Sequence, residues 1–307
     1  MERKDIGMGL FDKMKKKEKV LQQDKSQHAD HPGMIFMMHL LMDEKCEMPE
    51  KEHMTEVMRK HIGETECFCH DGKVAGFAAK NYLATFENGK KKLPPQLMIM
   101  DCIETQKPIM DEVAESQLWD CPEGKEILES CKYQVIATDM LAANLDYKER
   151  AEMLVDYIEA LMELYPTCKA VVFETSKKMF TRESIMNCTV PKQARFLYYA
   201  VNVRFFRVQG NNDSVVDSLG MSTLFLPDVQ YHFHDVEPNA VVNHAYNVLT
   251  YIFDNDNPIK DGDHIDGLID GHMSQEVQWN VQYEESLIQP IREVIDINMG
   301  EFSAGNR

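Results

Sequence analysis

The sequence predicts an α+β protein, and three observations lead to this fold class. Of the 307 residues, 44% are hydrophobic and 27% are charged, which is the composition of a globular chain with a real core. Short apolar runs of strand length recur along the chain, and two long amphipathic helical patterns lie among them. Each helix must bury its apolar stripe, and a sheet face is the surface that such runs provide.

The first half contains one predicted helix and several predicted strands. Residues 34–42 form a continuous apolar run of strand length, and Met54, Val57 and Met58 mark a helix that Gly63 ends. Asp71-Gly72 predicts a tight hairpin turn, because this pair tolerates the positive φ angles of a primed turn. Further strands are expected at residues 82–86 and 96–103, followed by a helical stretch at 108–130 that is broken at 121–124.

A similar order recurs about one hundred residues later. Strands are predicted at residues 132–138, 170–173 and 198–208, and a helix is predicted at 147–165 with apolar residues at helical spacing. Pairs such as Met54 and Leu154 mark the offset. We therefore expect two similar β-α-β-β modules packed together, with a C-terminal α+β extension.

This pattern gives three expected parts. Residues 1–32 form a basic flexible N-terminal segment, residues 33–130 a first α+β module, and residues 131–307 a second module with its extension. In the extension we expect a turn at 217–220, a helix at 238–254 that begins with Pro238, a strand at 279–283 and a short apolar segment at 291–297.

The net charge of −18 constrains partners and compartment. It comes from 51 acidic against 33 basic residues, and an acidic surface repels phosphate, so nucleic-acid binding is not expected. A basic protein partner is favoured instead. The eight cysteines are scattered, no secretory segment or long apolar stretch occurs, and the basic residues 9–17 have too few apolar anchors for stable membrane association. A cytoplasmic location with reduced thiols is predicted.

From about Cys131 onward, several short motifs occur in a recognisable order. These are the strand at 201–204, Asp217-Ser218-Leu219-Gly220, Leu226-Pro227-Asp228, and a loop at 259–267 that contains Asp261, Asp263 and His264. Together they resemble the bacterial family catalogued as domain of unknown function 4261, over about residues 131–297. The resemblance implies no settled activity, although it suggests an immunity-type or regulatory protein. Asp261, Asp263 and His264 are the candidate binding residues.

One cluster could hold a metal ion. His232, His234 and Asp235 lie within four residues, and two histidines two positions apart share one face of an extended strand. Histidine and aspartate are ligands of zinc and iron, so this cluster is the candidate metal site. Cys67 and Cys69, by contrast, are predicted to be core cysteines, because their spacing does not suit structural zinc.

No catalytic signature is present. The sequence lacks a phosphate-binding loop, a dinucleotide fingerprint and a hydrolase nucleophile motif, and it predicts no cofactor. The leading hypothesis is a non-enzymatic binding or regulatory protein that receives a basic partner. Two alternatives stay open: a metal-dependent enzyme that uses the His232–Asp235 cluster, and a small-molecule sensor with a pocket between the two halves. A homodimer is expected from the frequency of such assemblies.

Overall fold

The computed structural model describes residues 36–86 and 89–305. It confirms an α+β protein, with seven α-helices and three sheets within these residues. The predicted flexible segment at residues 1–32 lies outside the described residues. Across the described residues, we find no helix whose length and apolar character would suit a membrane span.

The first sheet has eight antiparallel strands. Its order is β10-β9-β1-β8-β6-β3-β2, and β7 pairs with β8. The strands are Met37–Met42 (β1), Thr65–His70 (β2), Val74–Ala79 (β3), Gln96–Met100 (β6), Ile103–Glu104 (β7), Tyr133–Met140 (β8), Ala170–Phe173 (β9) and Lys178–Thr181 (β10). A separate two-stranded ladder joins Ala84–Phe86 (β4) to Lys91–Leu93 (β5).

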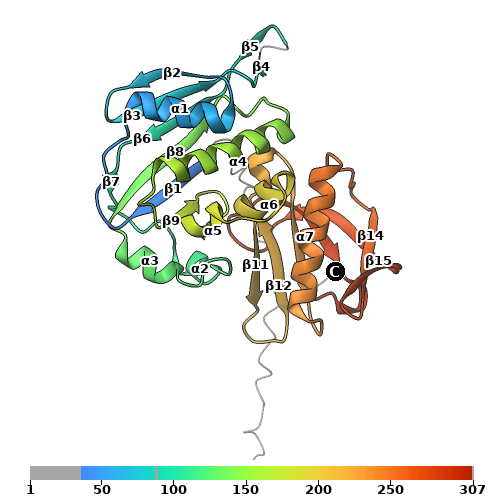
Figure 1. The fold of residues 1–307 in the computed structure, drawn as a ribbon. Helices are drawn as coiled ribbons and strands as arrows, with labels where there is room; N and C mark the ends of the chain where they lie inside the picture. The colour runs from blue at the N-terminus through green and yellow to red at the C-terminus, as the bar shows by residue number, and fades with distance from the viewer. Residues whose placement is uncertain (1–35, 87–88, 306–307) are drawn as a thin grey trace, which may run out of the picture.

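Helices cover both faces of this sheet (Figure 1). Lys51–Ile62 (α1) and Tyr147–Leu164 (α4) lie side by side on one face, where Met38 and Leu40 of β1 enter the main core. Leu41 points to the other face, into a smaller cluster with residues of the 109–131 segment. That segment contains the short helices Glu112–Glu115 (α2) and Gly124–Ser130 (α3). The alternation along β1 therefore serves two apolar layers.

The second sheet has six strands in the order β11-β12-β13-β16-β15-β14. They are Asn202–Arg207 (β11), Ser214–Leu219 (β12), Asp228–Phe233 (β13), His264–Ile269 (β14), His272–Glu285 (β15) and Glu293–Asn298 (β16). Only β13 and β16 are parallel among these neighbours. Pro238–Asp254 (α7) packs across β11, β12 and β13 (Figure 1).

Short helices lie between the two sheets. They are Arg182–Met186 (α5) and Arg195–Ala200 (α6), with the 3₁₀ turns Lys192–Ala194 (η1), Met221–Leu224 (η2) and Gly300–Phe302 (η3). Helix α4, which covers the first sheet, contacts α5, α6 and η2. The first sheet with its helices and the second sheet with α7, here called the two units, therefore meet through α4. One apolar cluster runs from Phe36 to Met299 through both units.

Two sequence-based expectations were wrong at this junction. Residues 198–208 were expected to form one strand, but Tyr198–Ala200 end α6 and the strand begins at Asn202. Phe196, Tyr199 and Ala200 are buried at helical spacing, and packing of this face overrides the β-propensity of the tyrosines. Residues 217–219 were expected in a turn, but they form the end of β12. Asp217 can lie inside a buried strand because two buried arginines pair with its carboxylate.

The predicted duplication is not confirmed. β1 and β8 are antiparallel neighbours at the centre of one sheet, and α1 and α4 are neighbours as expected of equivalent elements. The proposed match between residues 96–103 and 198–208 fails, because β6 belongs to the first sheet and β11 to the second. Residues on both sides of position 130 thus build the first sheet together.

Candidate functional site

A groove runs along the second sheet between α7 and the hairpin of β14 and β15. Its volume is about 320 Å³, and α7 forms one wall while β14 forms the other. The groove is lined by Asn247, Val248, Tyr251, Pro258, Ile259, Asp263, His264, Ile265, Asp266 and Met273. Segments from both sides of the 255–263 loop therefore contribute to one surface.

The candidate binding residues Asp261, Asp263 and His264 lie at the rim of this groove or beside it. The Asp261 carboxylate accepts a hydrogen bond from the Tyr283 N–H at 2.8 Å, and the Asp263 carboxylate accepts one from the Lys260 N–H at 2.7 Å. Each carboxylate thus fixes the loop through one oxygen. All three side chains are exposed, so both carboxylates also present charge to solvent.

Large apolar side chains are exposed beside these acids. Tyr251 of α7 is 50% exposed and Met273 of β15 is 45% exposed. Tyrosine gives a large rigid contact area with a polar tip, and methionine adapts to irregular partner surfaces. Apolar side chains with a charged rim are the usual composition of a protein-binding surface.

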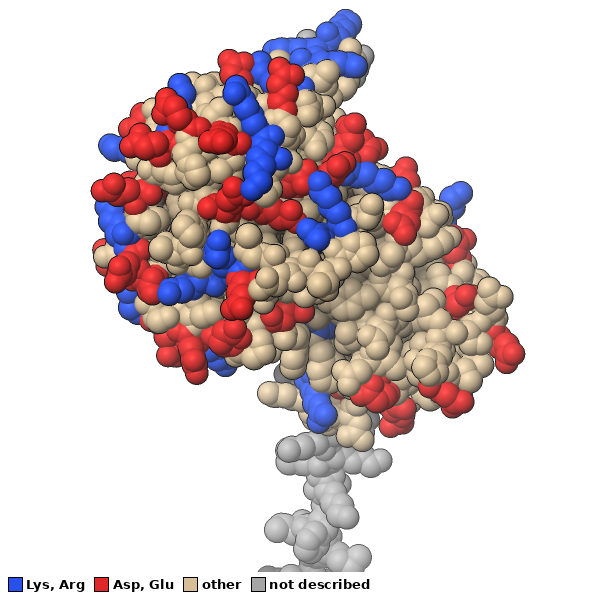
Figure 2. Space-filling model, in the orientation of Figure 1, with Lys and Arg blue, Asp and Glu red and all other residues tan. Residues whose placement is uncertain are grey.

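The charge of the protein is concentrated in this part of the chain. Residues 217–298 contain fifteen Asp and Glu but only two basic residues, Lys260 and Arg292. Arg292 is buried in ion pairs, which leaves Lys260 as the exposed Lys or Arg of this region. In Figure 2 the lower right part of the molecule accordingly shows acidic side chains on a neutral background, whereas basic side chains are frequent over the first sheet.

A buried histidine supports the groove from beneath. His244 of α7 accepts a hydrogen bond at Nδ1 from the Tyr231 hydroxyl at 2.8 Å and donates from Nε2 to the Asp266 carbonyl at 2.7 Å. These roles follow because a carbonyl oxygen can only accept. The ring therefore ties α7 to β13 and β14 in its neutral form. Burial lowers the pKa of His244 below its usual value of 6.5, against a smaller opposing effect of Asp266.

This pKa shift predicts acid sensitivity. Because the folded state resists protonation of His244, the unfolded state binds more protons below pH 6.5, and stability falls as the pH drops through that value toward the folded pKa. We expect His244→Gln to reduce stability more at pH 7.5 than at pH 5. Urea unfolding at both pH values measures this difference. The exposed His53→Gln is the control, and equal costs of H244Q at both pH values would contradict the assignment.

A buried network of charges lies at the β11–β12–β13 side of the sheet. Arg204 binds both carboxylate oxygens of Asp217, at 2.8 and 2.5 Å, and Arg292 binds Asp217 at 2.9 Å and Asp228 at 3.2 Å. Asp228 also accepts from the Ser218 hydroxyl at 2.7 Å. Sequence reasoning missed this network. Its signal was two arginines and two aspartates inside apolar strand-like runs, because charged side chains require partners when they are buried.

The structure places the residues of the candidate metal cluster in different environments. His232 ends up buried in β13 with Nε2 3.4 Å from the Asp213 carboxylate, while His234 lies beyond the strand end, partly exposed, and contacts Asp235 at 3.0 Å. Over residues 36–86 and 89–305, no three His, Cys, Asp or Glu side chains form a group that could hold a metal ion. The geometry therefore gives the metal site no support.

The fold and groove define an α+β protein of two packed sheets with an acidic surface on its C-terminal sheet. Residues 217–298 match the family described as Domain of unknown function (DUF4261). This match confirms the resemblance noted in the sequence, within a shorter range than residues 131–297. No curated protein and no solved structure matches this chain. The matched range contains the groove, His244, Arg292 and both of its aspartate partners.

Proposed function

We propose that this protein is a non-enzymatic binding protein, of the regulatory or immunity type, that receives a basic protein partner in the groove between α7 and β14. The observation that carries the proposal is the coincidence of charge and shape. Most of the net negative charge lies in the second sheet and its helix, and Tyr251 and Met273 are exposed there beside Asp261 and Asp263.

The physical roles of these groups differ. The acidic surface would accelerate encounter with a basic partner, an effect that salt screens. Tyr251 would supply much of the affinity, because tyrosines at the centre of an interface are frequent hot spots. Lys260 is the one exposed Lys or Arg of residues 217–298 and would do little to repel such a partner.

A site-specific photo-crosslinker at Asn247 tests the location in host cells. We expect adducts with a basic protein, and none of these adducts from a crosslinker at Glu126 on α3. The captured protein is then purified and its association rate is measured at several ionic strengths. An acidic captured protein, or identical adducts from both positions, would count against the groove.

Charge variants test the electrostatic part. In Asp261→Asn/Asp263→Asn the amide oxygens can still accept from the Tyr283 and Lys260 N–H groups, so the loop keeps its hydrogen bonds while two charges are lost. We expect this variant to associate several-fold more slowly at low salt. Glu126→Gln/Glu129→Gln removes the same charge from α3 and should have little effect. Equal rates for both variants would refute steering by the groove.

A substitution at the centre of the groove tests the apolar part. Tyr251→Ala should weaken binding by about 2 kcal/mol, mainly through faster dissociation. Because Tyr251 is exposed, its removal should leave the unfolding midpoint nearly unchanged. Titration calorimetry with the captured partner measures the loss, and an unchanged dissociation constant would place the contact elsewhere.

A further inference from the structure

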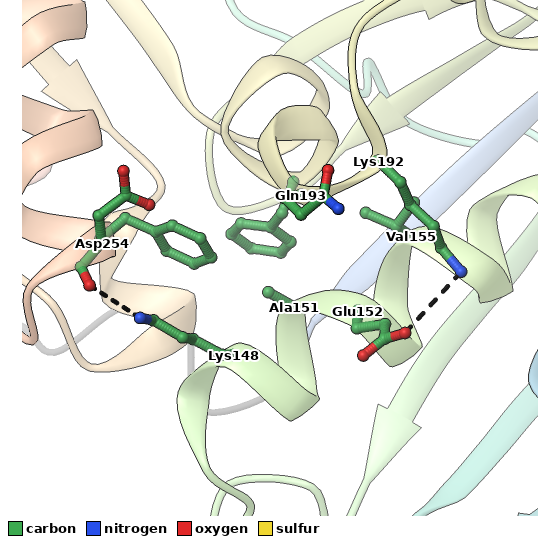
Figure 3. A pocket seen from close by; sticks show the side chains of 9 residues that line it. Lys148, Ala151, Glu152, Val155, Lys192, Gln193 and Asp254 are labelled. Atoms are coloured by element: carbon green, nitrogen blue, oxygen red, sulfur yellow. Dashed lines mark hydrogen bonds and ion pairs between the residues drawn. The ribbon is translucent and has the colours of Figure 1, made fainter.

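A second cavity lies where the two sheet units meet. Its volume is about 360 Å³, within the range of small-molecule sites, and it opens between α4, the η1–α6 segment and the last turn of α7 (Figure 3). Helix α4 contributes Lys148, Ala151 and Glu152, the η1–α6 segment contributes Lys192 and Phe196, and α7 contributes Phe253 and Asp254. The cavity shares no lining residue with the groove.

The aromatic walls of the cavity are held in place. The Phe196 ring packs against Phe36 at a centroid distance of 6.2 Å, and Phe253 meets Tyr147 edge to face at 5.7 Å. The Tyr147 hydroxyl also donates to the Phe253 carbonyl at 2.7 Å. Both residues are buried, with Phe196 1% and Phe253 7% exposed, so the wall they form is rigid, and a rigid wall lowers the entropic cost of binding a ligand.

The two lysines of the cavity differ in their partners. Lys192 lies 2.6 Å from the Asp156 carboxylate and 4.0 Å from that of Glu152, so its charge is balanced. Lys148 donates to the backbone carbonyl of Asp254 at 2.8 Å, and in the part of the chain that the structure describes no carboxylate forms an ion pair with it. Figure 3 shows the Asp254 carboxylate turned away from Lys148. Lys148 thus keeps both its charge and further donors for an anion.

We propose that this cavity binds a small aromatic carboxylate, with its ring against Phe196 and Phe253 and its carboxylate on Lys148. Apolar walls favour an aromatic body, and the ammonium group at one end selects a negative charge. Since the ligand touches both α4 and α7, its binding would stabilise the junction of the two units and raise the unfolding temperature in a concentration-dependent way. The proposal does not depend on the basic partner.

Phenylacetate and its uncharged amide, phenylacetamide, test the site on the full chain by titration calorimetry. We expect one saturable site for phenylacetate, with at least tenfold weaker binding of the amide. Lys148→Met should abolish this preference, because it removes a charge-assisted hydrogen bond. Lys125→Met, a change at an exposed lysine of α3, should leave both affinities unchanged.

A cavity-filling variant separates the site from nonspecific attraction. Ala151→Leu extends a side chain into the cavity and should weaken both probes, with circular dichroism as the check on folding. Absence of saturable binding, equal affinity for acid and amide, or wild-type phenylacetate affinity in K148M would each overturn the proposal. None of these measurements probes the α7–β14 groove, so their results do not bear on the proposal that a basic protein binds there.

Discussion

Replacing Arg292 with methionine is expected to lower the free energy of unfolding by about 3–5 kcal/mol, because removal of one partner leaves buried charges uncompensated. Arg292 is 2% exposed and contacts Asp217, Asp228 and the carbonyls of Ile288, Pro290 and Ser218. Asp217 would keep Arg204, but the Asp228 carboxylate would lose its basic partner. Urea unfolding at pH 7 measures the loss, with Lys260→Met as a surface control.

The pH dependence identifies the cause of this loss. Burial already raises the pKa of Asp228, and Arg292 opposes this effect. Without Arg292 the pKa of Asp228 in the folded state rises further, so the folded variant binds a proton that the unfolded chain releases. Protonation of Asp228 then stabilises the folded variant at low pH, and this stabilisation is lost as the pH rises through the folded pKa. The difference between wild type and R292M should therefore shrink as the pH is lowered from 7 to 5. A constant difference would indicate lost packing rather than an uncompensated charge.

Gly220→Ala should cost about 3 kcal/mol or more, through combined backbone strain and overpacking. Gly220 has a φ of 134°, and a Cβ at this position would lie 2.3 Å from the Ala200 carbonyl oxygen and 3.1 Å from the Val201 Cα. Both neighbours are backbone atoms at the end of α6, so the clash can be relieved only by moving the junction between α6 and β11.

Gly262→Ala is the matched control for this prediction. Gly262 also has a positive φ, of 85°, but a Cβ there would have open space around it. Its substitution should cost only about 1–2 kcal/mol, the penalty of a left-handed conformation. Thermal and urea unfolding of both variants measure the two costs. Similar values would mean that the contact with Ala200 contributes nothing.

Local signals in the sequence predicted individual elements well. The expected helix at 238–254 coincides with α7, because Pro238 marks its first turn and an apolar stripe repeats at helical spacing. The strand at 170–173 coincides with β9, and the helix at 147–165 differs from α4 by one residue. In each case the residues that decide the structure are neighbours in the chain.

Features that depend on distant residues could not be predicted. Nothing near residue 40 indicates that β1 lies between β8 and β9, and the ion pair of Arg292 with Asp217 joins separate strands. For the same reason the sequence did not place Tyr251 and Met273 beside Asp263 and His264. The loop residues themselves could be put forward as candidates from the sequence, because their turn chemistry and family resemblance are local.

The position of β1 also has a consequence for synthesis of the chain on the ribosome. Leu40 pairs with Val135 on one side and with Val171 on the other, so both edges of β1 lack their partners until much of the protein has been translated. During that interval the apolar side chains of Met38, Leu40 and Met42, which are fully buried in the folded protein, have no sheet to enter. The nascent chain therefore carries an unpaired apolar strand, the kind of segment that chaperones bind and that aggregates when they are absent.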